Sequence, residues 1–295
     1  MLRSGQGEEV TETALIPSQA STDTALIDLW LAGRPVTTQA AYRQDAARFV
    51  AYTGKPLADV TVGDIHAYAA HLAQQDRRPA SQRRPIAAIK SLLAFAVQVG
   101  YLRYNVGAVV KLRRAKDTLS ERILSEADIH RIISLEPDTR NAALLRLLYA
   151  TGGRVSEICA LTWRDVVWRD ADACQVTLYG KGDKTRAVWL PPSVGRDLRR
   201  LRGTAPAGAP VFVSRQGGKL TRVQVWRVVK AAAARAGIEA SPSPHWFRHA
   251  HVSHALDRGA PAHLVQTTVG HASLDTTTGY SHARPTESSA KYLAL

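Results

Sequence analysis

The chain has 295 residues, enough for two domains of roughly 150 residues, each with its own core. Its 39 Lys and Arg against 25 Asp and Glu give a formal net charge of +14. Such a charge indicates a protein that binds a polyanion, most commonly nucleic acid, and the alternative is a basic protein that has no such partner. Two cysteines exclude a disulfide framework and suit a reducing cytosol. A signal peptide is not expected, because the N-terminal segment lacks an apolar run of about 7–15 residues. A membrane span is not expected either, because the sequence has no stretch of about 18 apolar residues.

The first part of the chain is predicted to be helical. Residues 1–20 are rich in Ser, Thr, Gln and Glu and are expected to be disordered. Thr61 followed by Asp64 is typical of a capping box, and Gly54 is a natural helix stop. Apolar residues recur at helical spacing in four segments, 24–32, 37–54, 64–75 and 85–100. The pattern therefore predicts a bundle of four short helices over residues 21–107.

Residues 108–122 form a polar, non-periodic run that is rich in Lys and Arg. Such a run suits a linker that lies along a phosphate backbone, and a solvated hinge without nucleic-acid contact is the alternative. The candidate nucleic-acid contacts in and before this linker are Arg83, Arg84, Lys111, Arg113 and Arg114.

A second, larger domain is predicted over residues 123–295. Ser125 is the expected N-cap of its first helix, with Asp128 at the third helical position. A buried helix ends at Gly152 and Gly153, and another begins at RVSEICALTW. The period then changes to two, which predicts a three-stranded antiparallel meander from DVVW, CQVTLYG and TRAVWLP.

Helices return in the last part of the chain. Segments 220–236 and 244–257 are helical, the second with Ser243 as N-cap, Pro244 at its first position and Gly259 past its end. Further helices are expected around 262–269 and 273–280, and as an amphipathic tail over 285–295. The fold class predicted for the whole chain is mainly α with a small antiparallel β-sheet, and the second domain is α+β.

The most informative motifs are HWFRH at 245–249 and GHASLDTTTGYSH at 270–282. Upstream lie TGGRVSEI, which contains Arg154, and YGKGDKTR, which contains Lys181. Together they supply, in chain order, Arg154, Lys181, His245, Arg248, His271 and Tyr280. This set resembles the tyrosine site-specific recombinases, the Xer, Cre and phage-integrase group. The likeness covers the second domain in motif detail and the first in general pattern. The sequence departs mildly from the family pattern at Gly153, at Val269 and at the pair Trp246-Phe247 before Arg248.

The resemblance implies a SAM-like core-binding domain, a catalytic domain, and a role for each residue of the set. Arg154 and Arg248 would neutralise the non-bridging oxygens of a phosphodiester, since a guanidinium is always charged and binds phosphate through two donors. His271 would hydrogen-bond the scissile phosphate, Tyr280 would be the nucleophile, and His245 would accept or share its proton.

Lys181, in the turn between two strands, would be the general acid for the leaving 5′ oxygen, with Lys184 as the alternative. Glu157 lies one helical turn after Arg154 and is expected to support it by an i,i+3 pairing. No metal and no cofactor are expected, and GKGDKT is not a P-loop because the required earlier glycine is absent.

The resemblance further implies DNA strand exchange through a 3′-phosphotyrosyl intermediate on double-stranded DNA with a specific site. The expected assembly is a homotetramer on two sites, monomeric or dimeric off DNA, with a related recombinase as a further potential partner. The expected location is cytoplasmic and nucleoid-associated. Integration, excision and dimer resolution would use the same residues.

Three other readings compete with this one. A type IB topoisomerase shares the tyrosine chemistry, and residues 262–282 could form the helix-turn-helix of a non-catalytic DNA-binding protein. His245 and His249 have a spacing that suits zinc, but the glutamate of the metalloprotease motif is missing. His249, His251 and His254 are therefore interpreted as packing or capping residues, as Tyr292 is.

Overall fold

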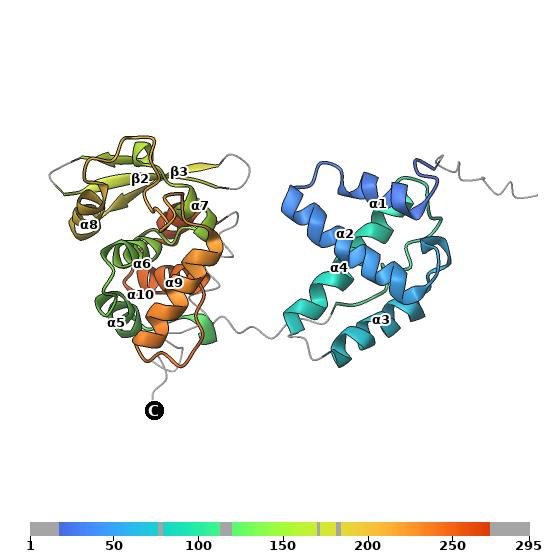
Figure 1. Ribbon diagram of the computed structural model, residues 1–295. Helices are drawn as coiled ribbons and strands as arrows, with labels where there is room; N and C mark the ends of the chain where they lie inside the picture. Colours follow the sequence, from blue (N-terminus) through green and yellow to red (C-terminus); the bar gives the residue numbers. More distant parts are fainter. Residues whose placement is uncertain (1–17, 76–78, 113–119, 170–171, 181–183, 272–295) are drawn as a thin grey trace, which may run out of the picture. The chain divides into compact units, whose positions relative to one another are not determined.

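A computed structural model of the chain describes residues 18–75, 79–112, 120–169, 172–180 and 184–271. The chain forms two compact units, residues 1–116 and 117–295 (Figure 1). The division falls inside the basic segment 108–122 that was expected to be a linker.

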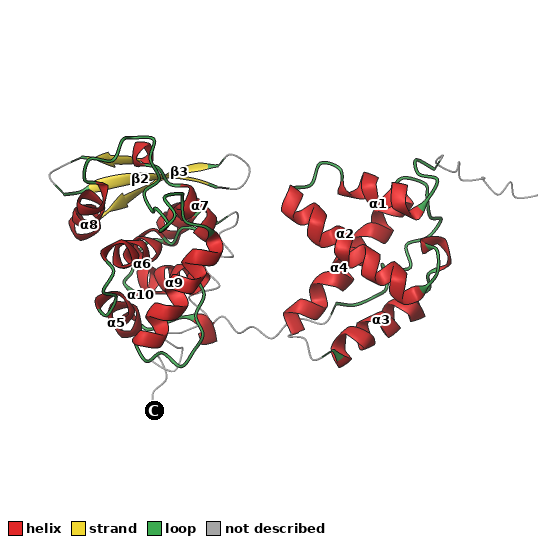
Figure 2. Cartoon of the chain, in the orientation of Figure 1, coloured by secondary structure: helices red, strands yellow, loops and turns green. Residues whose placement is uncertain are grey.

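The first unit is helical, and its described residues contain no strand (Figure 2). Its elements are α1 (Asp23–Leu31), α2 (Val36–Thr53), the 3-10 helix η1 (Leu57–Asp59), α3 (Val62–Gln74) and α4 (Pro79–Gln98). Thr61 and Asp64 form the expected capping box, and Gly54 ends α2 with a left-handed φ of 63°. Leu26, Phe49 and Ile89 are fully buried between the helices. The predicted four-helix bundle is confirmed.

Helix α4 begins at Pro79, earlier than the start at Pro85 that the sequence pattern indicated, so Pro85 lies inside the helix. That start was predicted because apolar residues recur at helical spacing only from Pro85 onward. In the structure Arg84 pairs at 3.0 Å with Asp45 of α2, whose side chain is completely buried. A buried carboxylate needs a positive partner, and the longer helix supplies one.

The second unit combines helices with a sheet at one end (Figure 1). It begins with the 3-10 helix η2 (Ser120–Arg122), α5 (Glu126–Ser134), α6 (Thr139–Thr151), α7 (Val155–Ala160) and the 3-10 helix η3 (Trp163–Asp165). The sheet then follows as β1 (Val166–Trp168), β2 (Cys174–Tyr179) and β3 (Thr185–Leu190), antiparallel in the order β1-β2-β3. This order confirms the predicted meander.

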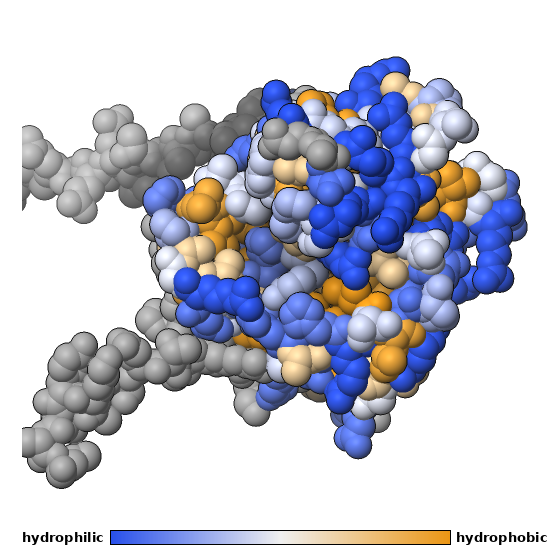
Figure 3. All heavy atoms as spheres, turned by 90° about the vertical axis from the view of Figure 1, so that its left-hand side faces the viewer, coloured by the Kyte–Doolittle hydropathy of each residue, from blue (hydrophilic) through white to orange (hydrophobic). Residues whose placement is uncertain are grey.

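Helix α8 (Pro192–Arg202) was not predicted from the sequence. Its apolar residues Val194 and Leu198 are buried at a spacing of one helical turn, but arginines dominate its composition. The helix lies so close to the loop before β2 that a Cβ on Gly195 would collide with the carbonyl of Asp172. Hydrophilic side chains cover much of the face of this unit that Figure 3 shows.

The described part of the unit closes with α9 (Arg222–Arg235), α10 (Pro244–Asp257) and α11 (Ala262–Val269). The predicted bounds of α10 and α11 are confirmed, and Ser243 is the N-cap of α10, although its side chain makes no capping hydrogen bond. Phe247 of α10 and Leu144 of α6 are fully buried in the core of this unit. The expected helices at 273–280 and 285–295 lie outside the described residues. Among the helices that the structure describes, none has the length and apolarity for a membrane span.

Candidate active site

The site begins at the tight connection between α6 and α7. Gly152 caps α6 in the left-handed conformation, with φ of 54°, and Arg154 is the N-cap of α7. A Cβ on Gly152 would lie 2.7 Å from Cγ1 of Val269, the last residue of α11. Glycine therefore allows α11 to approach this connection, and the side chain of Arg154, 40% exposed, is presented beside it.

Glu157 holds Arg154 at two points. Its Oε1 accepts from Nη1 of Arg154 at 2.9 Å, and its Oε2 accepts from the backbone N–H of Arg154 at 2.8 Å. The side chain of Glu157 is only 2% exposed. Burial raises the pKa of Glu157, but hydrogen bonds from Arg186 and Arg154 outweigh it, so the pKa lies below its usual value. The carboxylate is thus a fixed negative anchor for the guanidinium.

Arg186 of β3 is a third arginine at this site that no motif singles out in the sequence. Its Nη1 and Nη2 donate to Oε1 and Oε2 of Glu157 at 3.0 and 2.6 Å, and its Nε donates to the carbonyl of Thr268 at 2.7 Å. The sequence contains a weak signal for the role of Arg186, because it lies at every second position with the buried Val188 and Leu190 and so shares their face of the strand. A charged residue on a buried face requires a partner, but the sequence does not say which one.

Arg248 lies at the centre of the site and is 2% exposed. Its Nη1 donates to the carbonyl oxygens of Gly152 and Val269, both at 2.7 Å. These bonds fix the guanidinium of α10 against the ends of α6 and α11. His245 lies one turn earlier on the same helix, as the i,i+3 spacing predicts.

The two histidines of the set differ in exposure, since His245 is exposed and His271 is half-buried. His271 follows Gly270, whose carbonyl accepts from Nη2 of Arg154 at 3.1 Å. Burial, followed by the charges of Arg248 and Arg154, lowers the pKa of His271 to about 4. Partial desolvation of its ring, followed by the same two charges, lowers the pKa of His245. Both imidazoles are therefore neutral at pH 7 and able to accept a proton or a hydrogen bond.

His249 and Arg122 extend this group. The ring of His249 lies 4.4 Å from that of His245, centroid to centroid. Burial, followed by the neighbouring His245 and Arg122, lowers the pKa of His249 to about 4. Arg122 belongs to η2 and is the last residue of the segment 108–122, and its charge also lowers the pKa of His245. Like Arg186, Arg122 carries no motif in the sequence.

The structure thus gathers five residues from three separate segments, namely Arg154 and Glu157 of α7, His245 and Arg248 of α10, and His271 after α11. Lys181 and Tyr280 lie outside the described residues. Lys184, the alternative acid, is exposed, and its carbonyl accepts from the N–H of Gly180 at 2.8 Å in the turn between β2 and β3.

The remaining histidines of α10 have structural partners. Nδ1 of His251 lies 2.8 Å from the carbonyl oxygen of Tyr149, and Nδ1 of His254 lies 2.9 Å from the hydroxyl of the same tyrosine. Within the described ranges, no group of three or more His, Cys, Asp or Glu could hold a metal ion. Both cysteines pack in the hydrophobic core of this unit. Cys174 is fully buried, and the half-buried Cys159 packs against the core.

The nucleic-acid candidates of the first unit differ in their surroundings. Arg83 on α4 and Lys111 are exposed, whereas the half-exposed Arg84 pairs with Asp45. Arg113 and Arg114 lie outside the described residues.

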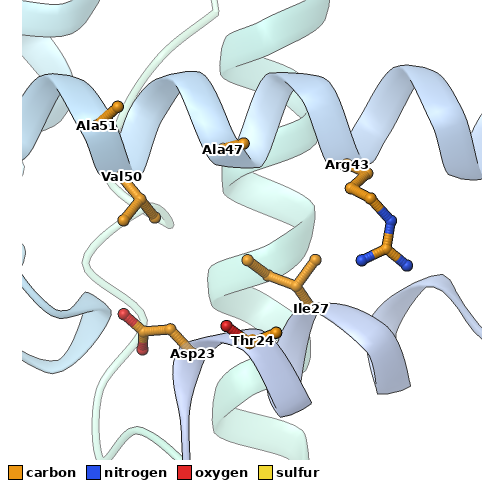
Figure 4. A pocket seen from close by; sticks show the side chains of 7 residues that line it. All are labelled: Asp23, Thr24, Ile27, Arg43, Ala47, Val50 and Ala51. Atoms are coloured by element: carbon orange, nitrogen blue, oxygen red, sulfur yellow. The ribbon is translucent and has the colours of Figure 1, made fainter.

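A hollow of about 380 Å³ lies between α1 and α2 of the first unit (Figure 4). Ile27, Ala47 and Val50 give it a mainly apolar lining. Its two charged residues are already engaged, since the Asp23 carboxylate accepts from Tyr101 and Arg43 pairs with Asp28.

Two guanidiniums and two neutral imidazoles around one point form a site suited to a phosphodiester. The comparisons with known proteins agree with this class. Residues 122–287 match the Phage integrase family, and residues 26–100 match the Phage integrase, N-terminal SAM-like domain. The chain belongs to the phage integrase family, whose members are tyrosine recombinases.

One relative is the Tyrosine recombinase XerD of Shewanella oneidensis, 32% identical over 277 residues that cover 88% of this chain and 91% of that protein. A lambda integrase(75-356) dimer bound to a COC′ core site has the same fold, with a TM-score of 0.73, 18% identity, and coverage of 91% of this chain and 98% of that one. A lambda integrase tetramer bound to a Holliday junction aligns with a TM-score of 0.68 at 17% identity, covering 86% of this chain and 78% of that one. The expected fold class, with its SAM-like and integrase catalytic domains, is confirmed.

Proposed function

We propose that this tyrosine recombinase cuts and rejoins DNA at specific sites through a 3′-phosphotyrosyl intermediate on Tyr280. The observation that carries the proposal is the convergence of Arg154, Arg248, His245 and His271, which α7, α10 and the end of α11 bring to one place. Membership of the phage integrase family supports it.

The cleavage step is a transesterification. The hydroxyl oxygen of Tyr280 attacks the phosphorus, the bond from phosphorus to the 5′ oxygen breaks, and the 3′ phosphate becomes joined to the tyrosine. His245, neutral at pH 7, takes the proton of Tyr280, and Lys181 gives a proton to the 5′ oxygen. In the rejoining step the 5′ hydroxyl of a partner strand attacks the phosphotyrosine. One phosphodiester replaces another, so neither ATP nor a metal is required.

Arg154 and Arg248 neutralise the charge that grows on the non-bridging oxygens. Arg248 is preorganised, because two backbone carbonyls hold its Nη1 before any substrate arrives. His271 donates a hydrogen bond to the same phosphate. Glu157 supports the reaction indirectly, since it fixes Arg154 through its buried carboxylate.

The DNA is double-stranded and carries a specific recombination site, and four subunits act on two sites. The net charge of +14 supports a DNA partner, and the lambda integrase tetramer on a Holliday junction supports the assembly. The other subunits are copies of this chain or a related recombinase. Arg83, Lys111, Arg113 and Arg114 are proposed to contact the phosphate backbone outside the active site, and the protein acts on DNA at the nucleoid, in the cytoplasm.

A nicked duplex that traps the covalent intermediate tests the proposal. Tyr280→Phe is expected to bind this duplex normally and to form no protein–DNA adduct, whereas Tyr292→Phe, the matched control, forms the adduct. An adduct that persists in Tyr280→Phe refutes the nucleophile. Joining of two duplexes, rather than relaxation of one, separates a recombinase from a type IB topoisomerase.

A further inference from the structure

Arg186 joins three segments that carry the proposed machinery. It belongs to β3, and its guanidinium spans from the carboxylate of Glu157 on α7 to the carbonyl of Thr268 on α11. Its side chain is 9% exposed, so these bonds lie largely out of water. β3 contacts α11 in the fold, and α11 leads directly to Gly270 and His271.

The two oxygens of Glu157 are divided unequally between two arginines. Arg186 takes both oxygens through two guanidinium nitrogens, at 3.0 and 2.6 Å. Arg154 reaches only Oε1 with its guanidinium, through Nη1, while its Nη2 donates to the carbonyl of Gly270. Oε2 is occupied by Arg186 and by the backbone N–H of Arg154.

This division matters because arginine and carboxylate prefer a two-point pair. If Arg186 were absent, Glu157 could turn both oxygens to the guanidinium of Arg154. Its negative charge would then be neutralised by Arg154 alone, and the arginine would be drawn towards the carboxylate. Arg186 also brings a positive charge of its own, so that two guanidiniums share one carboxylate.

We propose that Arg186 is a positioning residue for strand cleavage, which holds Glu157 so that Arg154 remains directed at the scissile phosphate. The same guanidinium fixes the end of α11 before Gly270. The inference rests on the proposed role of Arg154 in binding that phosphate. Arg186 on β3 thus has a positioning role that is separate from the proposed role of Lys181 as the general acid.

The first measurement is the rate of adduct formation on a nicked duplex at saturating DNA. Arg186→Ala is expected to react about 100-fold more slowly than the wild type, the loss typical of a misplaced catalytic group. Its affinity for the duplex should change little, because the guanidinium of Arg186 is largely buried and its donors are engaged by Glu157 and Thr268. Arg186→Lys should lie between the two, since lysine keeps the charge but cannot make the two-point pair.

The second measurement replaces the scissile phosphate by a methylphosphonate, which has no negative charge. An arginine that neutralises the phosphate is less necessary on this substrate. Relative to the wild type on the same substrate, the deficits of Arg154→Ala and Arg186→Ala should both shrink to within about 10-fold. The double variant should be no slower than Arg154→Ala alone, because both changes remove the same interaction.

The matched control is Arg235→Ala. Arg235 pairs at 2.8 Å with Glu136, whose side chain is 2% exposed, so this variant removes an arginine from a buried glutamate elsewhere in the same unit. It should cleave both substrates at the wild-type rate. Melting temperatures are measured for all variants, and Arg186→Lys serves as the test if Arg186→Ala does not fold.

The outcomes separate the inference from the function on which it rests. A slow Arg154→Ala together with wild-type rates for Arg186→Ala and Arg186→Lys overturns the inference and leaves the proposed function intact. An Arg186 deficit that is equal on phosphate and methylphosphonate also overturns it, because that result indicates general damage. A wild-type rate for Arg154→Ala overturns the role of Arg154, and the inference with it.

Discussion

Nη1 of Arg248 donates a 2.7 Å hydrogen bond to the carbonyl of Gly152, which ends α6 in the left-handed conformation with φ of 54°. The left-handed cap aims this carbonyl at the buried guanidinium of α10. Arg248 also donates to the carbonyl of Val269, so its guanidinium links α10 to the ends of both α6 and α11. The placement of a proposed catalytic arginine therefore depends on a residue without a side chain.

Gly152→Ala is expected to destabilise the protein by about 2–4 kcal/mol, as the sum of left-handed strain and overpacking. The new Cβ would lie 2.7 Å from Cγ1 of Val269 and 2.9 Å from the ring of His251. Gly259→Ala is the control, because Gly259 has φ of 82° but no atom within 4 Å of an added Cβ. It should cost about 1–2 kcal/mol. Chemical denaturation measures both, and equal losses would contradict the close approach of α11.

Lys181→Ala is expected to cleave ordinary DNA about 100- to 10,000-fold more slowly, because a 5′ alkoxide needs a proton to leave. DNA with sulfur at the bridging 5′ position should restore its rate, since a thiol has a pKa of about 8.5 and the thiolate can leave without a proton. Arg154→Ala should remain slow on both substrates. Adduct formation on nicked duplexes measures all of these rates.

The same sulfur substrate tests the alternatives to Lys181. Rescue of Lys184→Ala in place of Lys181→Ala would assign the acid to the exposed lysine that closes the turn. If sulfur rescues neither variant, the acid lies outside this hairpin and His245 becomes the candidate.

Binding to duplex DNA should weaken steeply with salt, by about 0.9 log units per log unit of salt for each neutralised phosphate. Arg83→Ala should reduce this slope by about 0.9 and leave the melting temperature unchanged, because Arg83 is exposed. Its neighbour behaves differently: Arg84→Ala leaves the buried carboxylate of Asp45 without its ion-pair partner and should lower the stability by about 1–3 kcal/mol. An affinity that is independent of salt would contradict a nucleic-acid partner.

Stability should fall as the pH falls from about 6.5 towards 4. Burial is the largest cause that lowers the pKa of His249, His251 and His271 to about 4 in the folded protein. Unfolded histidines take up protons near pH 6.5, so between these values the unfolded state binds more protons and is favoured. Above about pH 6.5 these groups have no such effect.

A single variant tests this pH dependence. His251→Gln should show a flatter decline of melting temperature between pH 6.5 and 4 than the wild type, because one buried histidine no longer titrates. His263→Gln, a change at an exposed position of α11, should retain the wild-type decline. Parallel curves for all three proteins would contradict the assignment.

Local features of the sequence determined most elements of the fold. Pro244 and Gly259 bracket α10, and the change to a period of two gave the meander of β1 to β3. Caps, glycine stops and apolar periodicity act within a few residues, so they can be read without a partner segment. Glu157 was predictable for the same reason, since an i,i+3 spacing on one helix brings it to Arg154.

Tertiary structure alone decided where the other charged residues go. Arg186 pairs with Glu157 across 29 residues and bonds the carbonyl of Thr268 across 82, and Arg84 pairs with Asp45 across 39. No local rule fixes such pairs, because a charge on a strand or helix only requires some partner, and packing determines which one is near. The sequence thus determined the residue types of the site and the elements that carry them. The packing of α6, α10 and α11 around Gly152 decided how those residues meet, because that close approach depends on the space left by a missing side chain.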